Sequence, residues 1–289
     1  MPRHAAQPAA TTVTGGAASI AIGNSDDNSD KAQASSPQML PTLGSGSRLR
    51  LSADGSLIDL IGSVAVNGVQ STTLRSSTAI FVCAVLKWWH HEHDFVGRFD
   101  SVGGLDLTAR QIYPVTLTDY TVNINNPNGR ISIDANGSDV PVLSAGGSVT
   151  MHAAYIDQGG NLRAPFGAID LQADKELTLK PGSITSTSLQ GVTTLFGQVE
   201  LGKDWVYLLN ILTTNAKGRL VFTKPSNRDA DPLPSSQVLL QAPSVRLQPG
   251  AVIDQSGGGD LLAYEFEPGL SGTVDVNITQ AEAMRWCRG

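Results

Sequence analysis

The sequence predicts an all-β protein, a parallel β-helix in which short strands stack in successive coils. Three observations support this prediction: a composition of strand and turn formers, a strand pattern that recurs along the chain, and a second motif that recurs in phase with it. The 289 residues include 30 glycines, and charged residues make up only 16%, below the roughly 25% of an average soluble domain. Strands joined by tight turns suit this composition better than helices do.

The recurring pattern opens with a glycine or a serine, continues with apolar residues that alternate with polar ones, and often closes with an alanine. Alternation with a period of two is typical of a short strand with one buried face. The glycine suits a turn before the strand, and the small alanine suits a corner after it. Copies occupy residues 46–53, 103–109, 129–135, 147–153, 167–173 and 236–242, and a shorter copy, "GTVDV", occupies 272–276.

The distances between copies predict the length of one coil. Gly104 and Gly147 are 43 residues apart, Gly147 and Gly167 are 20 apart, and Gly167 and Ser236 are 69 apart. These distances are close to two, one and three units of about 20–23 residues, a length typical of solenoid repeats.

A second motif has the same phase as the first. "LTLKPGSITS" (177–186) matches "VRLQPGAVID" (245–254) at an offset of 68 residues, shortly after a copy of the alanine pattern each time. Pro-Gly makes a sharp turn. One unit then contains a strand, a short turn, a second strand, a Pro-Gly turn and a third strand, which together fill a coil of about 22 residues.

The inward-facing residues follow from the same pattern. In a β-helix, alternate residues point inward and stack on their counterparts in the next coil, at a strand spacing of about 4.8 Å. We therefore expect Val149, Met151, Ile169 and Leu171 to point inward and to stack in adjacent coils. A β-sandwich is the alternative, but its hairpins would not keep a fixed spacing.

The chain divides into three segments. Residues 1–40 are rich in Ala, Ser, Thr, Asn and Asp, and we expect a disordered or weakly ordered arm there. Residues 41–276 hold the β-helix repeats, with an irregular insertion near 70–100, where "STTLRSSTAIFVCAVL" fits the repeat badly. Residues 277–289 abandon the alternation and form a short tail.

Charge and targeting signals narrow the classes of function. A net charge of −6 without a basic face argues against nucleic-acid binding. No apolar run reaches the roughly 18 residues of a transmembrane segment, and the N-terminal residues lack the apolar stretch of a signal peptide. The two cysteines, Cys83 and Cys287, are too few for a disulfide framework and have no metal-site spacing.

The stretch "SGGGDLLAYEF" (256–266) has three possible interpretations: a calcium-binding loop, a phosphate loop, or a bend between strands. Calcium-binding glycine repeats occur in tandem, whereas "GGGD" occurs once. A phosphate loop carries a lysine after its glycines, whereas Leu261 and Leu262 follow here. We therefore expect a bend between "AVID" and "LLAYEF", with Asp260 bonded to the turn.

A histidine-rich stretch, "KWWHHEHDF" (87–95), is the one candidate for a metal site. His91 and His93 would share one face of a strand, with His90 and Glu92 on the other. Imidazole and carboxylate groups are suitable zinc ligands, but the spacing matches no zinc enzyme signature. A solvated loop inserted between coils is the interpretation that we prefer.

Catalysis would need clustered carboxylates, as in the pectin-degrading lyases and glycosidases that are built on β-helices. Asp157, Asp170, Asp174 and Asp254 are available, but they form no clear pair in the sequence. We therefore assign no catalytic, cofactor-binding or metal-binding residue, and we expect no cofactor.

Several long stretches resemble the filamentous haemagglutinin family, large exoproteins of Gram-negative bacteria that are exported by two-partner secretion. The stretches are "GGLDLTARQIYP" (103–114), "LSAGGSVTMHAAYIDQGGNLRAPFGAIDLQA" (143–173), "LTLKPGSITSTS" (177–188) and "GAVIDQSGGGDLLAYEFEPGLSGTVDV" (250–276). The resemblance covers roughly residues 45–276, and this stretch is similar to the distal part of such proteins. It implies a right-handed β-helical shaft that is secreted or displayed at the cell surface or outer membrane.

The resemblance also implies a function and partners. The usual role of the family is adhesion, with host-cell or surface receptors and an outer-membrane β-barrel transporter as partners. We find no N-terminal secretion domain, so we interpret the chain as a fragment of such a shaft with no catalytic activity. The alternative is a polysaccharide-degrading lyase or glycosidase on a β-helix, and a third possibility is an inert spacer.

Overall fold

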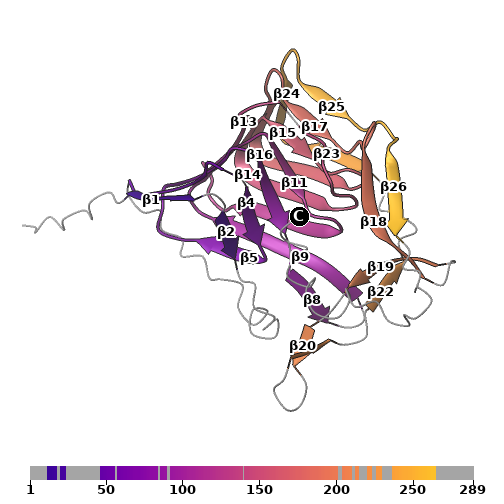
Figure 1. The fold of residues 1–289 in the computed structure, drawn as a ribbon. Coiled ribbons are helices and arrows are strands. Elements are labelled where there is room, and N and C mark those ends of the chain that lie inside the picture. The colour runs from indigo at the N-terminus through magenta and orange to yellow at the C-terminus, as the bar shows by residue number, and fades with distance from the viewer. Residues whose placement is uncertain are drawn as a thin grey trace, which may run out of the picture.

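The computed structural model describes residues 12–17, 20–23, 46–55, 57–83, 85–89, 92–138, 140–200, 204–209, 212–214, 220–222, 226–229 and 236–264. Within these residues the protein is all-β, without helices, and most strands run parallel in curled sheets (Figure 1). Strand pairing sorts most strands into three rows, which we name row 1, row 2 and row 3. Within each row, neighbouring strands are parallel.

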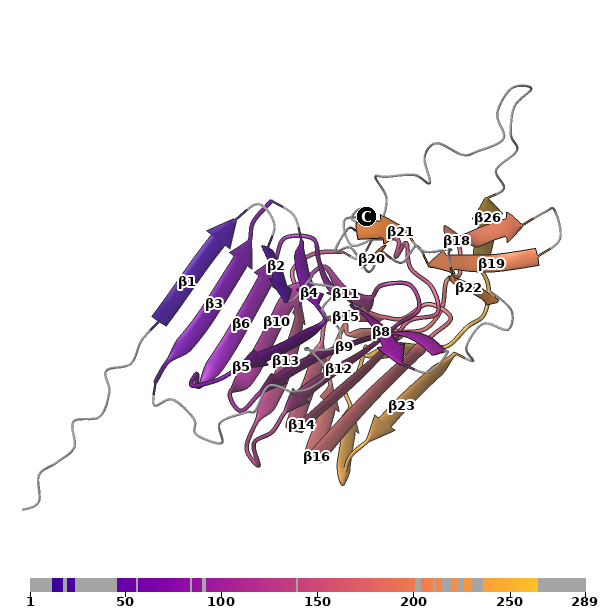
Figure 2. The ribbon, with the colours of Figure 1, turned by 90° about the horizontal axis from the view of Figure 1, so that it is seen from below.

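Row 1 is the longest row, and its strands lie side by side in Figure 2. In order of pairing it contains β1 (Thr12–Ala17), β3 (Arg48–Ala53), β6 (Ser71–Ser76), β10 (Gly104–Ala109), β13 (Arg130–Ala135), the C-terminal halves of β14 (Ser148–Gly159) and β16 (Ala168–Leu179), and β24 (Ser244–Leu247).

Rows 2 and 3 complete the regular part of the fold. Row 2 contains β2 (Ile20–Gly23), β4 (Ile58–Ile61), β7 (Ala79–Cys83), β11 (Gln111–Pro114), β15 (Asn161–Arg163), β17 (Ile184–Ser186) and β25 (Val252–Asp254). Row 3 contains β5 (Ser63–Val66), β9 (Glu92–Ser101), β12 (Thr118–Ile124), the N-terminal halves of β14 and β16, and β23 (Gln237–Gln241).

The chain visits the rows in turn. After β5 it passes through row 1 (β6), row 2 (β7) and row 3 (β9), and then through β10, β11 and β12 in the same order. The long strands β14 and β16 each belong to row 3 with their N-terminal half and to row 1 with their C-terminal half. The pairing between them shifts register between Ala153 and Tyr155 of β14. A register shift of this kind bends a strand, so one strand can turn the corner between two rows.

The three rows share one hydrophobic core. It contains Val149 from row 3, Leu105 from row 1 and Ile112 from row 2. Alternate residues of each strand supply it, as in β10, where Leu105, Leu107 and Ala109 are buried and Asp106 is exposed.

The expectation for the inward-facing residues is confirmed. Val149 pairs with Ile169 and Met151 pairs with Leu171 in parallel register. All four side chains are buried. Parallel pairing in this register places the inward residues of one strand beside the inward residues of the next. The alternation of apolar and polar residues in the sequence was therefore enough to identify all four.

The predicted phase of the alanine pattern is wrong in part. The first three copies form β3, β10 and β13 of row 1, whereas the last three form row 3 strands in β14, β16 and β23. The 69-residue distance is a single layer rather than three, because Ala168 pairs directly with Gln237. Between these residues the chain also forms the row 1 half of β16 and β17 of row 2, and strands between residues 193 and 229 that belong to no row.

The Pro-Gly motif stacks as its offset of 68 predicts. Leu177 pairs with Val245, and Ile184 pairs with Val252. The turns stack too, because the amide of Gly182 donates to the carbonyl oxygen of Gly250 at 3.0 Å.

Part of the segment that we expected to be weakly ordered is paired in the structure. Residues 12–17 and 20–23, inside the expected weak arm, form β1 and β2 and pair with β3 and β4. The rest of residues 1–40, apart from these strands, and the predicted tail, 277–289, lie outside the described residues.

The irregular insertions also differ from expectation. Among the described residues near 70–100, β6 and β7 lie in rows 1 and 2, whereas β8 (Val85–Trp89) leaves the rows and pairs antiparallel with β9. A second insertion was not predicted. It contains β18 (Thr193–Glu200), β19 (Asp204–Leu209), β20 (Leu212–Thr214), β21 (Leu220–Phe222) and β22 (Ser226–Asp229), and β26 (Asp260–Tyr264) pairs with β18.

The described part of the chain contains no helix with the length and apolar character needed to cross a membrane.

Candidate functional site

The glycine stretch forms the bend that the sequence predicts, between β25 and β26. Gly258 and Gly259 have φ angles of 116° and 92°, a region that side-chain-bearing residues rarely adopt. A Cβ at Gly259 would lie 2.3 Å from the carbonyl oxygen of Leu189. The amide of Asp260 then donates to the carbonyl oxygen of Val192 at 3.0 Å, which starts the pairing of β26 with β18.

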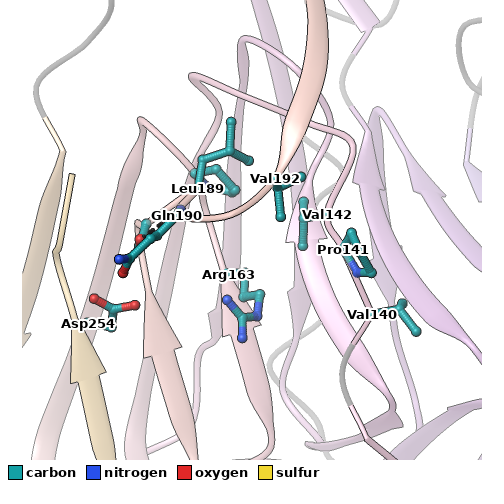
Figure 3. A pocket seen from close by; sticks show the side chains of 10 residues that line it. Val140, Pro141, Val142, Arg163, Leu189, Gln190, Val192 and Asp254 are labelled. Atoms are coloured by element: carbon teal, nitrogen blue, oxygen red, sulfur yellow. Dashed lines mark hydrogen bonds between the residues drawn. The ribbon is translucent and has the colours of Figure 1, made fainter. Parts of the chain in front are cut away.

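A pocket of about 340 Å³ lies next to this bend, beside row 2 (Figure 3). One wall is apolar and the other is polar, with Arg163 between Asp254 and Pro141 in the view of Figure 3. The apolar lining residues are Val140, Pro141, Val142, Pro165, Leu189 and Val192, and the polar ones are Arg163, Ser188, Gln190 and Asp254.

Asp254 is held as a carboxylate in this pocket. The hydroxyl of Ser256 donates to its Oδ1 at 2.6 Å, and the amide of Ser256 donates to the same oxygen at 2.9 Å. The hydroxyl of Ser186 donates to Oδ2 at 3.3 Å. These bonds, and the nearby charge of Arg163, lower the pKa of the Asp254 carboxyl.

Removal of the Ser256 hydroxyl should therefore raise the pKa of Asp254 toward its ordinary value. A lowered folded-state pKa stabilises the protein above the unfolded-state pKa, and this contribution is lost as the pH falls through the folded-state value. Ser256→Ala should thus unfold at lower urea than wild type at pH 7, and the difference should shrink as the pH falls through the lowered pKa of Asp254. Carboxyl NMR titration and urea unfolding measure both effects.

Ser236→Ala is the matched control, because Ser236 is exposed immediately before β23. It should leave the Asp254 titration unchanged. The same Asp254 pKa in Ser256→Ala and wild type would contradict the assignment of these hydrogen bonds.

The structure does not bring the four candidate acids together. Asp157 lies in the row 1 half of β14, Asp170 in the row 3 half of β16, Asp174 at the bend of β16, and Asp254 at the end of β25 in row 2. The first three have partners of their own: Arg130 is paired with Asp157, the Gln172 amide donates to Asp170 at 2.6 Å, and His152 Nε2 lies 3.0 Å from Asp174.

A different group of acids lies on the outer surface of row 1, and the sequence analysis missed it. We name it the row 1 acidic group: Asp106, Asp134 and Asp157, on the neighbouring strands β10, β13 and β14. Asp106 pairs across with Ser132, and Ser132 with Asp157. The signal was present in the sequence, because the copies "GGLDLTA" and "GRISIDA" both place aspartate at an outward position.

Charges within the row 1 acidic group are partly compensated. Lys180 Nζ lies 3.5 Å from Asp134, and Arg130 is paired with Asp157. Asp106 points outward, but neighbouring groups cover part of its carboxyl, and this partial burial raises its pKa. The charge of Asp134 raises the pKa further, while a hydrogen bond with Thr73 opposes the shift.

The possible zinc ligands cannot be placed, since the side chains of residues 90–93 lie outside the described part of the structure. The backbone of Lys87–Trp89 pairs antiparallel with Glu92–Asp94, so the stretch forms a hairpin that leaves the rows. Among the described residues, no group of three His, Cys, Asp or Glu side chains is arranged to hold a metal ion.

Comparison with known proteins adds no relative: the sequence matches no family model, and no curated protein or solved structure matches it.

Proposed function

We propose that this chain is a segment of a right-handed parallel β-helix, the shaft of a filamentous haemagglutinin-like adhesin that is secreted or displayed at the cell surface. The observation that carries the proposal is the pairing of the three rows in successive layers. Strands 20 to 26 residues apart pair in parallel in several layers, as Val149 does with Ile169 and Leu105 with Ile131. Coils of this size are typical of a solenoid.

An adhesive role fits the outer surface that such stacking produces. Outward residues from successive layers lie in columns, for example Arg50, Thr73, Asp106 and Ser132 in row 1. Each layer adds one polar residue to such a column, so the surface grows along the shaft without a change in fold. Solenoids use extended surfaces of this kind for binding. By the family resemblance, the partners are host-cell or surface receptors and an outer-membrane transporter.

A cell-binding assay tests the adhesive role. Beads coated with the full chain are expected to bind epithelial cells several times more often than beads coated with an unrelated acidic protein of similar size and net charge. Heat-denatured chain is the second control, because a receptor that recognises columns of residues needs the folded protein. Equal binding of folded chain and acidic control protein would contradict the adhesin proposal and favour a spacer.

A polysaccharide-degrading lyase or glycosidase is the second candidate, and the row 1 acidic group is the observation in its favour. Three carboxylates with Arg130 and Lys180 among them resemble the charge pattern that such chemistry needs. Against it, Asp134 and Asp157 are engaged with these cations. Release of unsaturated or reducing ends from polygalacturonate, lost in Asp106→Asn but not in Asp170→Asn, would establish the enzyme.

A further inference from the structure

The pocket beside the glycine bend has two opposite charges in one column of row 2. Arg163 ends β15 and Asp254 ends β25, and both pair in register with Ser186 of the strand between them, β17. Two strand spacings therefore separate the Cα atoms of Arg163 and Asp254 by about 10 Å. Both side chains line the pocket (Figure 3). A ligand that contacts both needs two charges of its own, held apart.

The Asp254 carboxylate can accept one further hydrogen bond. A carboxylate has about four lone-pair sites. Among the described residues, the hydroxyl and the amide of Ser256 use two sites on Oδ1, and the Ser186 hydroxyl uses one on Oδ2. The Ser188 hydroxyl lies 3.0 Å from the Ser256 hydroxyl and donates to it, because the Ser256 proton is directed at Asp254. This chain of hydroxyl groups fixes the carboxylate and leaves Oδ2 able to accept from an ammonium group.

Arg163 supplies the opposite charge. Its charge contributes to the lowered pKa of Asp254, so the two groups are close enough to interact electrostatically. A guanidinium group binds a carboxylate through two parallel hydrogen bonds, a geometry that a lysine ammonium does not offer. The pocket can therefore hold a carboxylate at Arg163 while it holds an ammonium group at Asp254.

The apolar wall of the pocket suits an aliphatic chain. Val142, Pro165 and Leu189 are buried, so packing holds these parts of the wall in place. The described lining residues include no aromatic ring and so lack the platform on which a nucleobase stacks. The volume of about 340 Å³ is near the lower end of the roughly 300–1,000 Å³ of ligand pockets, which favours a small ligand.

We propose that this pocket binds a small zwitterion whose ammonium and carboxylate groups are separated by an aliphatic stem, as in the C-terminal lysine of a peptide. The ammonium group bonds to Oδ2 of Asp254, the carboxylate bonds to the guanidinium of Arg163, and the methylene groups pack on Val142 and Leu189. A lysine side chain provides such a stem, because four carbons carry its ammonium group away from Cα. The adjacent charges of glycine are too close together to reach both groups.

The inference does not rest on the adhesive role. Its test measures a small probe in solution, without cells. A chain that bound no cells would still bind the probe, and a chain without this pocket could still bind cells, so the two proposals fail separately.

Calorimetric titration of the full chain with 6-aminohexanoate at pH 7 tests the proposal. We expect binding at one site. Hexanoate and hexylamine, which each lack one of the two charges, should bind at least about tenfold more weakly, because each leaves one charged hydrogen-bonding group of the pocket without its ligand partner. Glycine should bind as weakly as these two. This comparison of probes uses the unaltered protein, so it does not depend on the folding of a variant.

Two further probes distinguish a peptide end from a free amino acid. Nα-acetyl-lysine keeps the carboxylate and the ε-ammonium group, whereas its amide lacks the carboxylate. Binding of Nα-acetyl-lysine as tightly as 6-aminohexanoate, with loss in the amide, would identify the end of a chain as the ligand. Binding of 6-aminohexanoate alone would identify a free ω-amino acid, which has the same chemistry.

Variants then locate the site. Asp254→Asn and Arg163→Gln should each weaken binding of 6-aminohexanoate by about tenfold or more. The matched controls are Asp170→Asn on row 3 and Arg246→Gln on row 1, since neither residue lines the pocket. Both should bind as wild type does. Circular dichroism confirms that each variant is folded before the titration.

Three results would overturn the proposal. The first is that 6-aminohexanoate does not bind to wild type. The second is that hexanoate binds as tightly as 6-aminohexanoate, because the pocket would then be a simple anion site at Arg163. The third is that folded Asp254→Asn and Arg163→Gln bind the probe as tightly as wild type, because the probe would then lie elsewhere on the protein.

Discussion

The Gly167→Ala variant is expected to lose about 3 kcal/mol or more of its free energy of unfolding, because one added methyl group would collide with backbone. A Cβ at Gly167 would lie 1.7 Å from the carbonyl oxygen of Gly147 and 2.8 Å from its carbonyl carbon. Backbone atoms cannot rotate away as a side chain can. The same oxygen accepts a hydrogen bond from the Ala168 amide at 3.3 Å, so relief of the clash would separate two layers.

Urea unfolding followed by circular dichroism measures this loss. Gly257→Ala is the matched control, because a Cβ there meets no atom within 4 Å; its stability should change by no more than about 0.5 kcal/mol. If Gly167→Ala unfolds at the same urea concentration as wild type, the two layers are not in the close contact that the structure gives them.

The sequence predicted the structure correctly where a short repeating pattern, such as the two-residue alternation of a strand, determines which residues are buried. Inward positions such as Met151 and Leu171 follow from alternation alone, because side chains of a strand alternate between its two faces. The Pro-Gly motif also succeeded, since its two strands and the turn between them recur as one unit at a constant offset.

The assignment of strands to rows could not be predicted in the same way. An alternating pattern indicates which residues of a strand face the core. Because all three rows face the same core, strands of row 1 and row 3 have the same alternating pattern, and the pattern does not indicate the row. The change of phase occurs where β13 is followed by β14 without a row 2 strand between them. The second insertion was not predicted because the 69 residues between Gly167 and Ser236 are close to three repeat lengths.

The pocket could not be predicted because it has no local motif. Its lining comes from four separate parts of the chain, near residues 141, 164, 190 and 254. One signal was available. The offset of 68 residues places Ser186 beside Asp254 and Ser188 beside Ser256, and the structure shows both contacts.

The Leu171→Ala variant is expected to lose about 2–5 kcal/mol of its free energy of unfolding. Leu171 is fully buried between Met151 and Leu240 of the two adjacent layers. Truncation removes its apolar contacts with both layers and leaves a cavity that backbone pairing on either side keeps from collapsing. Thermal and urea unfolding should both show the loss.

Leu143→Ala is the control with identical chemistry, because the Leu143 side chain is 70% exposed. Its stability should change by less than about 0.5 kcal/mol, so the difference between the two variants isolates burial from the change of residue type. A similar small effect at both positions would mean that Leu171 is accessible to water, as it would be if the β14 and β16 layers were not stacked over a common core. A large loss at Leu171 alone would show that each layer depends on the layers beside it, which is the property that allows a shaft to be extended coil by coil.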